Sequence, residues 1–347
     1  MQRSKWFAFV LGLSTLLAAQ SAQAQLDNVK RVGGATTTGK FKSMSKDGVV
    51  IFANSLDNDV PANEIVSITY ASEPADVRTA QLALRNGRFN DAKETLSEVV
   101  MDNLPRDEIK HEVAYALAVC DANLAMTGEV SVDDALKSML GFVGAYRDSY
   151  HFYEACELLG DLSVRKGDFT NAKKYYGQLN SAPWADYRMK AGVLAGRAAQ
   201  AQNDHAGAIR AFEYVLKQSS DTPEGKRATL AATLGKAVSL TESNPAQAAT
   251  AIDVVQKVIN DAAPEETDLH ARAYNALGKC YLTTGNDQEA LMAFLHVDVV
   301  FNSNPDEHAE ALSNLATVWG KVGKADRARE AAAMLKEYYP NSKWAQR

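Results

Sequence analysis

The sequence predicts a mainly α-helical protein, a solenoid of about seven helix hairpins that follows a small N-terminal β module. The helical prediction rests on a recurring skeleton of a glycine, an alanine five residues later and, four further on, a bulky residue. The skeleton occurs in "GRFNDAKETL" from Gly87, "GDFTNAKKYY" from Gly167 and "GNDQEALMAF" from Gly285, and more weakly in "GKADRAREAA" from Gly323. The β module is predicted from strand-forming runs separated by turn residues, which end before residue 71.

The first 24 residues differ from the rest of the chain. The basic start "MQRSK" is followed by the apolar stretch "WFAFVLGLSTLLAA" and then by the small residues of "AQA". This three-part pattern is typical of a secretory signal peptide, so we predict residues 1–24 to be a signal peptide cleaved after Ala24. The alternative is an uncleaved membrane anchor, for which the apolar stretch is short. The protein is therefore expected to be exported, either periplasmic or extracellular.

Charge and cysteine content limit the classes of function. The 347-residue chain has a formal net charge of −6, and loss of Arg3 and Lys5 with the signal peptide would make it more acidic. An acidic chain without a basic tail argues against nucleic acid or an anionic membrane as the main partner. Three cysteines are too few for a disulfide-dense framework. Cys120 and Cys156 lie at similar points of consecutive units, so they either pair or remain free as buried apolar residues.

Residues 25–71 are predicted to form the β module. The runs "TTTGKFKSMS", "GVVIFA" and "VPANEIVSITY" are separated by "KDG" and "LDND", which we interpret as hairpin turns. Three or four strands are expected. The module resembles small SH3-like or Sm-like barrels, some of which bind ligands; alternatively, it only caps the helical array.

The recurring skeleton has a direct physical interpretation. A glycine ends one helix where the backbone takes a left-handed conformation. The alanine lets two antiparallel helices approach closely, and the bulky residue on the same face fills the space beside them. Each hairpin leaves an apolar face that the next hairpin must cover, so the pattern predicts a stacked solenoid.

Residues 274–294 carry a more specific pattern. "YNALGKCY" from Tyr274, followed by Gly285, Ala290 and Phe294, resembles the tetratricopeptide repeat order of aromatic, Leu-Gly, aromatic, alanine and aromatic residues. "CELLGDLSVRKGDFTNAKKYY" and "LSNLATVWGKVGKADRAREAAAMLKEYYP" are similar. Seven units are counted over residues 75–342, with the alanine at positions 92, 135, 172, 208, 248, 290 and 328. These spacings exceed the family's usual ~34 residues, so we expect an irregular superhelix. The C-terminal part, ending "LKEYYPNSKWAQ", is also similar to periplasmic members of cell-envelope assembly and Tol-Pal-associated division.

The sequence contains no recognisable catalytic motif. The six histidines lack metal-ligand spacing, and neither a GxxxxGK[ST] phosphate loop nor a GxSxG motif occurs. His296 and His308 flank a loop near Asp298, where a structural role is favoured over chemistry. We therefore expect no enzyme activity, no metal and no cofactor.

The resemblance implies a binding surface, because the first helix of each tetratricopeptide hairpin lines a concave groove where peptides bind. Mapping those helix faces onto this chain nominates Glu154, Glu157, Asp161, Lys190, Arg197, Lys236, Arg272, Asn275 and Lys279. Arg272, Asn275 and Lys279 share one helix face, so they are expected to converge on one ligand. One hypothesis is a groove that captures an acidic peptide or a C-terminal carboxylate. The other is that these charges pair across adjacent helices or only solvate the surface.

These observations favour an exported, non-catalytic scaffold that binds other proteins or extended peptides, with a role in organising the cell envelope. Two alternatives remain open. The first is a structural protein of the envelope, in which the array self-associates as a spacer. The second, with no motif behind it, is an enzyme that hydrolyses cell-wall material. The sequence does not indicate the oligomeric state.

Overall fold

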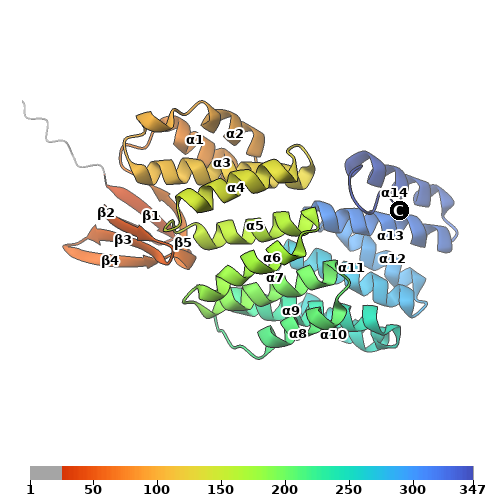
Figure 1. Cartoon of the computed structure of the whole chain (residues 1–347). Coiled ribbons are helices and arrows are strands. Elements are labelled where there is room, and N and C mark those ends of the chain that lie inside the picture. The colour runs from red at the N-terminus through yellow and green to blue at the C-terminus, as the bar shows by residue number, and fades with distance from the viewer. Residues whose placement is uncertain (1–25, 347) are drawn as a thin grey trace, which may run out of the picture.

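The computed structural model describes residues 26–346, which form a small antiparallel sheet followed by fourteen α-helices (Figure 1). The predicted signal peptide and its cleavage site at Ala24 lie outside the described residues. Within residues 26–346, no helix combines the length and the apolar composition needed to cross a membrane.

The sheet has five strands in the order β4-β3-β2-β1-β5, more than the three or four that were predicted. They are β1 (Asp27–Arg31), β2 (Thr36–Ser45), β3 (Gly48–Ala53), β4 (Leu56–Pro61) and β5 (Ile65–Thr69). The prediction of "LDND" as a turn was wrong, because these residues belong to β4 and pair with β3. The turn is formed by Asn54 and Ser55, both in the left-handed region with φ of 54° and 64°. Similarity to SH3-like or Sm-like barrels stays a prediction.

The helices form seven consecutive antiparallel hairpins, as predicted. The first helices of the hairpins are α1 (Ala75–Arg85), α3 (Asp107–Thr127), α5 (Phe152–Lys166), α7 (Ala185–Ala201), α9 (Pro223–Ser243), α11 (Thr267–Thr283) and α13 (Pro305–Lys321). The second helices are α2 (Phe89–Ser97), α4 (Val132–Ala145), α6 (Phe169–Gln178), α8 (His205–Leu216), α10 (Ala248–Asp261), α12 (Asp287–Val299) and α14 (Ala325–Tyr338).

Five of the seven turns inside the hairpins follow the predicted glycine rule, whereas the turn of the fifth hairpin has no residue in the left-handed region. Gly167 ends α5 with φ of 79°, and the side chain of Asp168 then caps α6 by accepting a hydrogen bond from the Asn171 backbone N–H. The fourth hairpin has Asn203 at the same point, with φ of 59°. Asparagine is the residue that next best tolerates this conformation, which explains why the skeleton is less visible there.

The skeleton alanines lie where the two helices of a hairpin approach each other. Ala92, Ala172, Ala208 and Ala290 are fully buried. Ala328 is only partly buried, because no further hairpin follows α14 in the described chain. The bulky residues four positions later, such as Tyr176 and Phe294, fill the adjoining space in the core.

The first and second helices form two layers. Each second helix from α2 to α12 packs against the first helix of its own hairpin and that of the next, and most neighbouring first helices also contact one another, as α7 and α9 do. The first helices therefore make one layer, which we call the inner layer, and their polar side chains are the ones that can converge.

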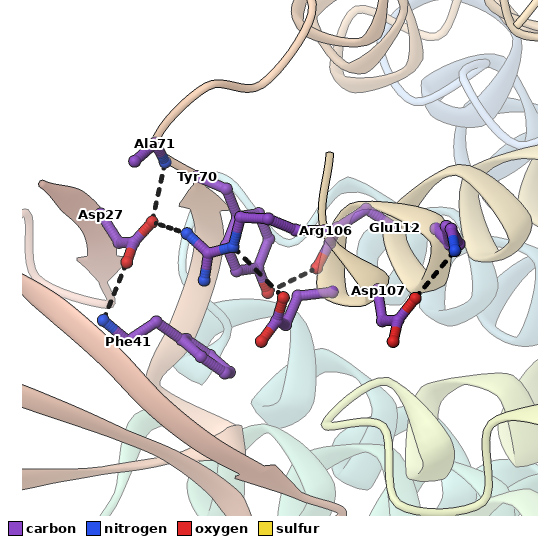
Figure 2. A network of polar contacts seen from close by, with 9 residues as sticks. Asp27, Phe41, Tyr70, Ala71, Arg106, Asp107 and Glu112 are labelled. Carbon is purple, nitrogen blue, oxygen red and sulfur yellow. Dashed lines mark hydrogen bonds and ion pairs between the residues drawn. The ribbon is translucent and has the colours of Figure 1, made fainter. Parts of the chain in front are cut away.

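The β module shares one hydrophobic core with the first hairpins. Side chains such as Ile51 and Ile68 of the sheet belong to the same cluster as Val77 of α1 and Val113 of α3. A polar network crosses the same boundary (Figure 2). The buried carboxylate of Asp27 accepts hydrogen bonds from the backbone N–H groups of Phe41 and Ala71 and from the guanidinium of Arg106, the last at 2.6 Å. The sheet is thus packed against the start of the array.

Candidate functional site

Charged side chains from four first helices lie within electrostatic range of one another on the inner layer. They are Asp161 of α5, Arg197 of α7, Asp268 and Arg272 of α11, and Glu307 of α13, and we call these five residues the inner cluster. The other four members all act electrostatically on Arg197. Charges from the third, fourth, sixth and seventh hairpins therefore share one region, as expected if the stack of first helices is curved.

Most of the nominated cations are already paired with carboxylates. Lys190 forms an ion pair with Glu157 of α5, and Lys279 forms one with Glu310 of α13. The Nε of Arg272 lies 3.0 Å from a carboxylate oxygen of Asp268 and 3.5 Å from one of Glu307. For these side chains the structure has the contacts that the pairing hypothesis expects.

Asn275 is positioned by the same neighbouring helix. Its side chain is buried, and its Nδ2 donates to the backbone carbonyl and the carboxylate of Glu307, at 2.9 and 3.0 Å. Arg272 and Asn275 thus share the partner Glu307, so α11 and α13 are joined by a polar contact as well as by packing.

The contacts of Lys236 and Lys279 lie outside the inner cluster. Lys236 pairs with Glu213 of α8, at 2.8 Å, so its partner is on a second helix rather than in the inner cluster. The Lys279 ammonium lies 5.8 Å from the ring centre of Trp344 in the C-terminal segment. Trp344 therefore lies beside the Lys279 end of this face.

Arg197 is the exception among the nominated cations. It makes no hydrogen bond or ion pair to any residue within 26–346, although it is partly buried on the inner layer. Burial lowers the pKa of the Arg197 guanidinium to about 10, and the nearby charge of Arg272 adds to this effect. The acidic members of the inner cluster oppose the shift without contacting the guanidinium. A partly desolvated guanidinium without a direct partner is a place where an added anion would be stabilised.

The three nominated acids have different surroundings. Asp161 accepts a hydrogen bond from the Tyr176 hydroxyl at 2.7 Å, and burial raises its pKa to about 6. Glu154 has a side chain that is 61% exposed, and one of its oxygens lies 3.6 Å from Nδ1 of His151. Glu154 is therefore accessible, whereas Glu157 is engaged with Lys190.

Other candidate residues have structural contacts. His308 lies 2.8 Å from Asp298 through Nε2 and 2.7 Å from the Tyr339 hydroxyl through Nδ1, and His296 stacks on Tyr274. Cys120, Cys156 and Cys280 are buried and unpaired, so the Cys120–Cys156 disulfide alternative is not present. Among residues 26–346, no group of three or more histidine, cysteine or acidic side chains is arranged to hold a metal ion.

The aromatic side chains of Trp184, Tyr187 and Tyr281 belong to the packing between helices. Trp184 and Tyr187 make ring contacts with each other, and both contact Tyr153. Tyr281 packs on the apolar clusters of the last hairpins, with its hydroxyl accepting from Gln256. Two shallow pockets in the described chain, of about 360 and 420 Å³, contain none of the nine nominated residues.

Sequence comparison assigns the repeats. A family model described as tetratricopeptide repeat matches residues 193–264, and a second with the same description matches residues 153–182 and 271–297. The chain contains tetratricopeptide repeats. The first, second and seventh hairpins lie outside the matched ranges, yet they have the same paired-helix form in this tetratricopeptide array.

Solved structures share the fold of this tetratricopeptide protein. It is similar to a tetratricopeptide repeat protein from Parabacteroides merdae ATCC 43184, with 13% identity, a TM-score of 0.52 and coverage of 78% of this chain and 94% of that one. It is also similar to NprR in complex with its cognate peptide NprX, with 13% identity, a TM-score of 0.51 and coverage of 80% and 82%. At these identities the similarity concerns the fold. None of the curated proteins compared with the chain matches it.

Proposed function

We propose that this tetratricopeptide protein is a non-catalytic scaffold that binds an extended segment of another protein along its inner layer. The observation that supports the proposal best is the Arg197 guanidinium, which is partly buried without a direct partner while its neighbours are paired. Leaving an arginine in this state costs stability, and a ligand carboxylate would offset that cost by a charge-assisted hydrogen bond. NprR, which has the same fold, was solved with a peptide bound.

The chemistry of the inner layer indicates the class of ligand. Arg197 would take an acidic side chain or a C-terminal carboxylate of the bound segment. Glu154 lies on α5, the first helix of the hairpin that precedes the one with Arg197. Its accessible carboxylate would favour a basic or amide group elsewhere in the same bound segment. We therefore propose a ligand of mixed charge with at least one carboxylate, bound without a cofactor.

The place of action follows from the predicted signal peptide. We propose that the protein is exported and that its partners are proteins of the cell envelope. Its similarity to Tol-Pal-associated members of the family remains a prediction.

The proposal can be tested by capturing partners on the purified protein with two matched variants. Arg197→Gln removes the unpaired cation, and Lys236→Gln removes a cation of similar exposure that is paired with Glu213 outside the inner cluster. We expect Arg197→Gln to lower recovery of native partners at least tenfold and to leave the thermal midpoint unchanged or raised, since an unpaired charge is lost. Lys236→Gln should retain capture. Equal recovery with both variants would contradict the role of Arg197.

A further inference from the structure

The strongest feature outside the inner layer is a buried glutamate at the boundary between the sheet and the helices. Glu73 lies in the segment between β5 and α1, and only 4% of it is exposed. Its backbone N–H donates to the Tyr70 carbonyl at 3.2 Å, and one carboxylate oxygen accepts from the side-chain amide of Gln81, also at 3.2 Å. The other oxygen is buried and has no hydrogen-bond partner within the described chain.

The charges that face Glu73 come from two helices. Glu112 of α3 acts on it with the same sign, whereas Arg78 and Arg85 of α1 act with the opposite sign. Burial raises the pKa of Glu73 to about 7, and the charge of Glu112 adds to that increase. An ionised Glu73 would thus leave one oxygen unsolvated while facing another carboxylate.

Glu112 is held in place from three directions. It accepts hydrogen bonds from the hydroxyls of Tyr70 at 3.4 Å and Tyr150 at 2.9 Å, and its second oxygen lies 3.2 Å from Nε2 of His151 (Figure 2 shows the Tyr70 contact). Because Tyr70 is the last residue before the connecting segment, the same carboxylate both anchors the sheet to α3 and opposes the charge of Glu73.

We propose that the contact between the β module and the first repeats is a proton-sensitive joint, which is closed while Glu73 is protonated and loosens when Glu73 ionises. In the closed joint a neutral carboxyl faces Glu112 without repulsion. When the proton is lost, exposing the segment around Glu73 to water hydrates the unpaired oxygen and removes the repulsion. The consequence is a β module whose attachment to the array weakens as the pH rises from the ordinary glutamate pKa, near 4.5, to about 7, and changes little above that.

Hydrogen exchange of the full chain measures this joint directly. Exchange of amides in β5 and at the start of α1 is compared between the wild type and Glu73→Gln, a variant that keeps the shape of the protonated carboxyl. Between pH 5 and pH 7.5, we expect wild-type protection to fall roughly 50-fold more than that of Glu73→Gln, if opening restores an ordinary glutamate pKa. Amides of α13 provide an internal reference, and Glu98→Gln, at an exposed position after α2, provides a variant control.

Comparing the wild type with Glu73→Gln separates the effect of Glu73 from that of His151, because His151 also titrates in this region and is present in both proteins. Parallel pH profiles for the wild type and Glu73→Gln would overturn the proposal. If Glu73→Gln is poorly protected even at pH 5, Glu112→Gln replaces it as the test variant. Glu112→Gln removes the charge that faces Glu73, so amide protection should be lost at a lower pH in this variant than in the wild type. Loss of protection at the same pH in both proteins would also contradict the proposed joint.

Discussion

The ring of Phe294 in α12 lies directly against Gly278 of α11. A β-carbon added at Gly278 would come within 2.5 Å of the ring carbon Cζ, closer than such contacts occur in proteins. The same arrangement joins Gly160 to Tyr176, and Phe212 lies between Gly196 and Gly235 of two successive first helices. The glycines of the first helices thus set how closely neighbouring helices approach.

This relationship predicts opposite effects for two glycine-to-alanine substitutions. Gly278→Ala should lower the free energy of unfolding by about 1–3 kcal/mol, because the added methyl group overpacks a close helix contact. Gly320→Ala, in a helix with nothing within 4 Å of the added carbon, should raise it by up to about 1 kcal/mol. Urea denaturation of both variants checks this, and equal effects would mean that the close approach does not constrain the fold.

The three free cysteines should react slowly in the folded protein and be counted as three thiols after unfolding. Burial raises the pKa of Cys120 to about 11 and that of Cys156 to about 12, so both thiols should be protonated and slow to react in the folded protein. A thiol reagent should label them slowly in buffer and label all three cysteines rapidly in denaturant without reductant. A single reactive thiol in denaturant would show a disulfide between the other two cysteines.

Loss of the Asp27 carboxylate should destabilise the protein strongly, because this group joins the sheet to the helices. Asp27→Asn weakens three hydrogen bonds and leaves Arg106 without its buried counter-charge, so stability should fall by about 3–5 kcal/mol. Asp57→Asn removes the exposed ion pair with Lys42, and should cost less than about 1 kcal/mol. Denaturant unfolding distinguishes these outcomes, and a mild effect of Asp27→Asn would contradict the anchoring role.

His151 predicts a loss of stability at alkaline pH. Burial alone would lower its pKa, but the carboxylates of Glu112 and Glu154 outweigh this and raise it to about 9. A base whose pKa is raised on folding stabilises the fold fully below its unfolded pKa, near 6.5, and this stabilisation is lost as the pH rises through 9. The loss should reach up to about 3 kcal/mol in the wild type and be absent in His151→Gln. Unfolding curves at intervals of pH measure it, and a flat wild-type profile above pH 6.5 would rule it out.

The number of hairpins could be predicted from sequence because the glycine–alanine skeleton describes a local contact within each hairpin. The five-stranded sheet was only partly predictable, since β1 is a short polar segment and β4 contains acidic residues that resemble a turn. The unpaired state of Arg197 depends on which helices meet across the curved array, and no local pattern encodes that. Glu112 was not among the residues predicted to be functional. The available signal was its place on the apolar face of α3, three residues after Ile109 and four before Ala116.

Photocrosslinking from single positions tests the binding role of the inner layer most directly. A photoreactive amino acid is introduced at Lys190, an accessible position on the first helix α7, or at Arg210, an exposed position on the second helix α8. After irradiation in native cells, we predict that position 190 yields covalent adducts with partner proteins and that position 210 yields few or none. Adducts that form equally at both positions, or mainly at 210, would contradict the account.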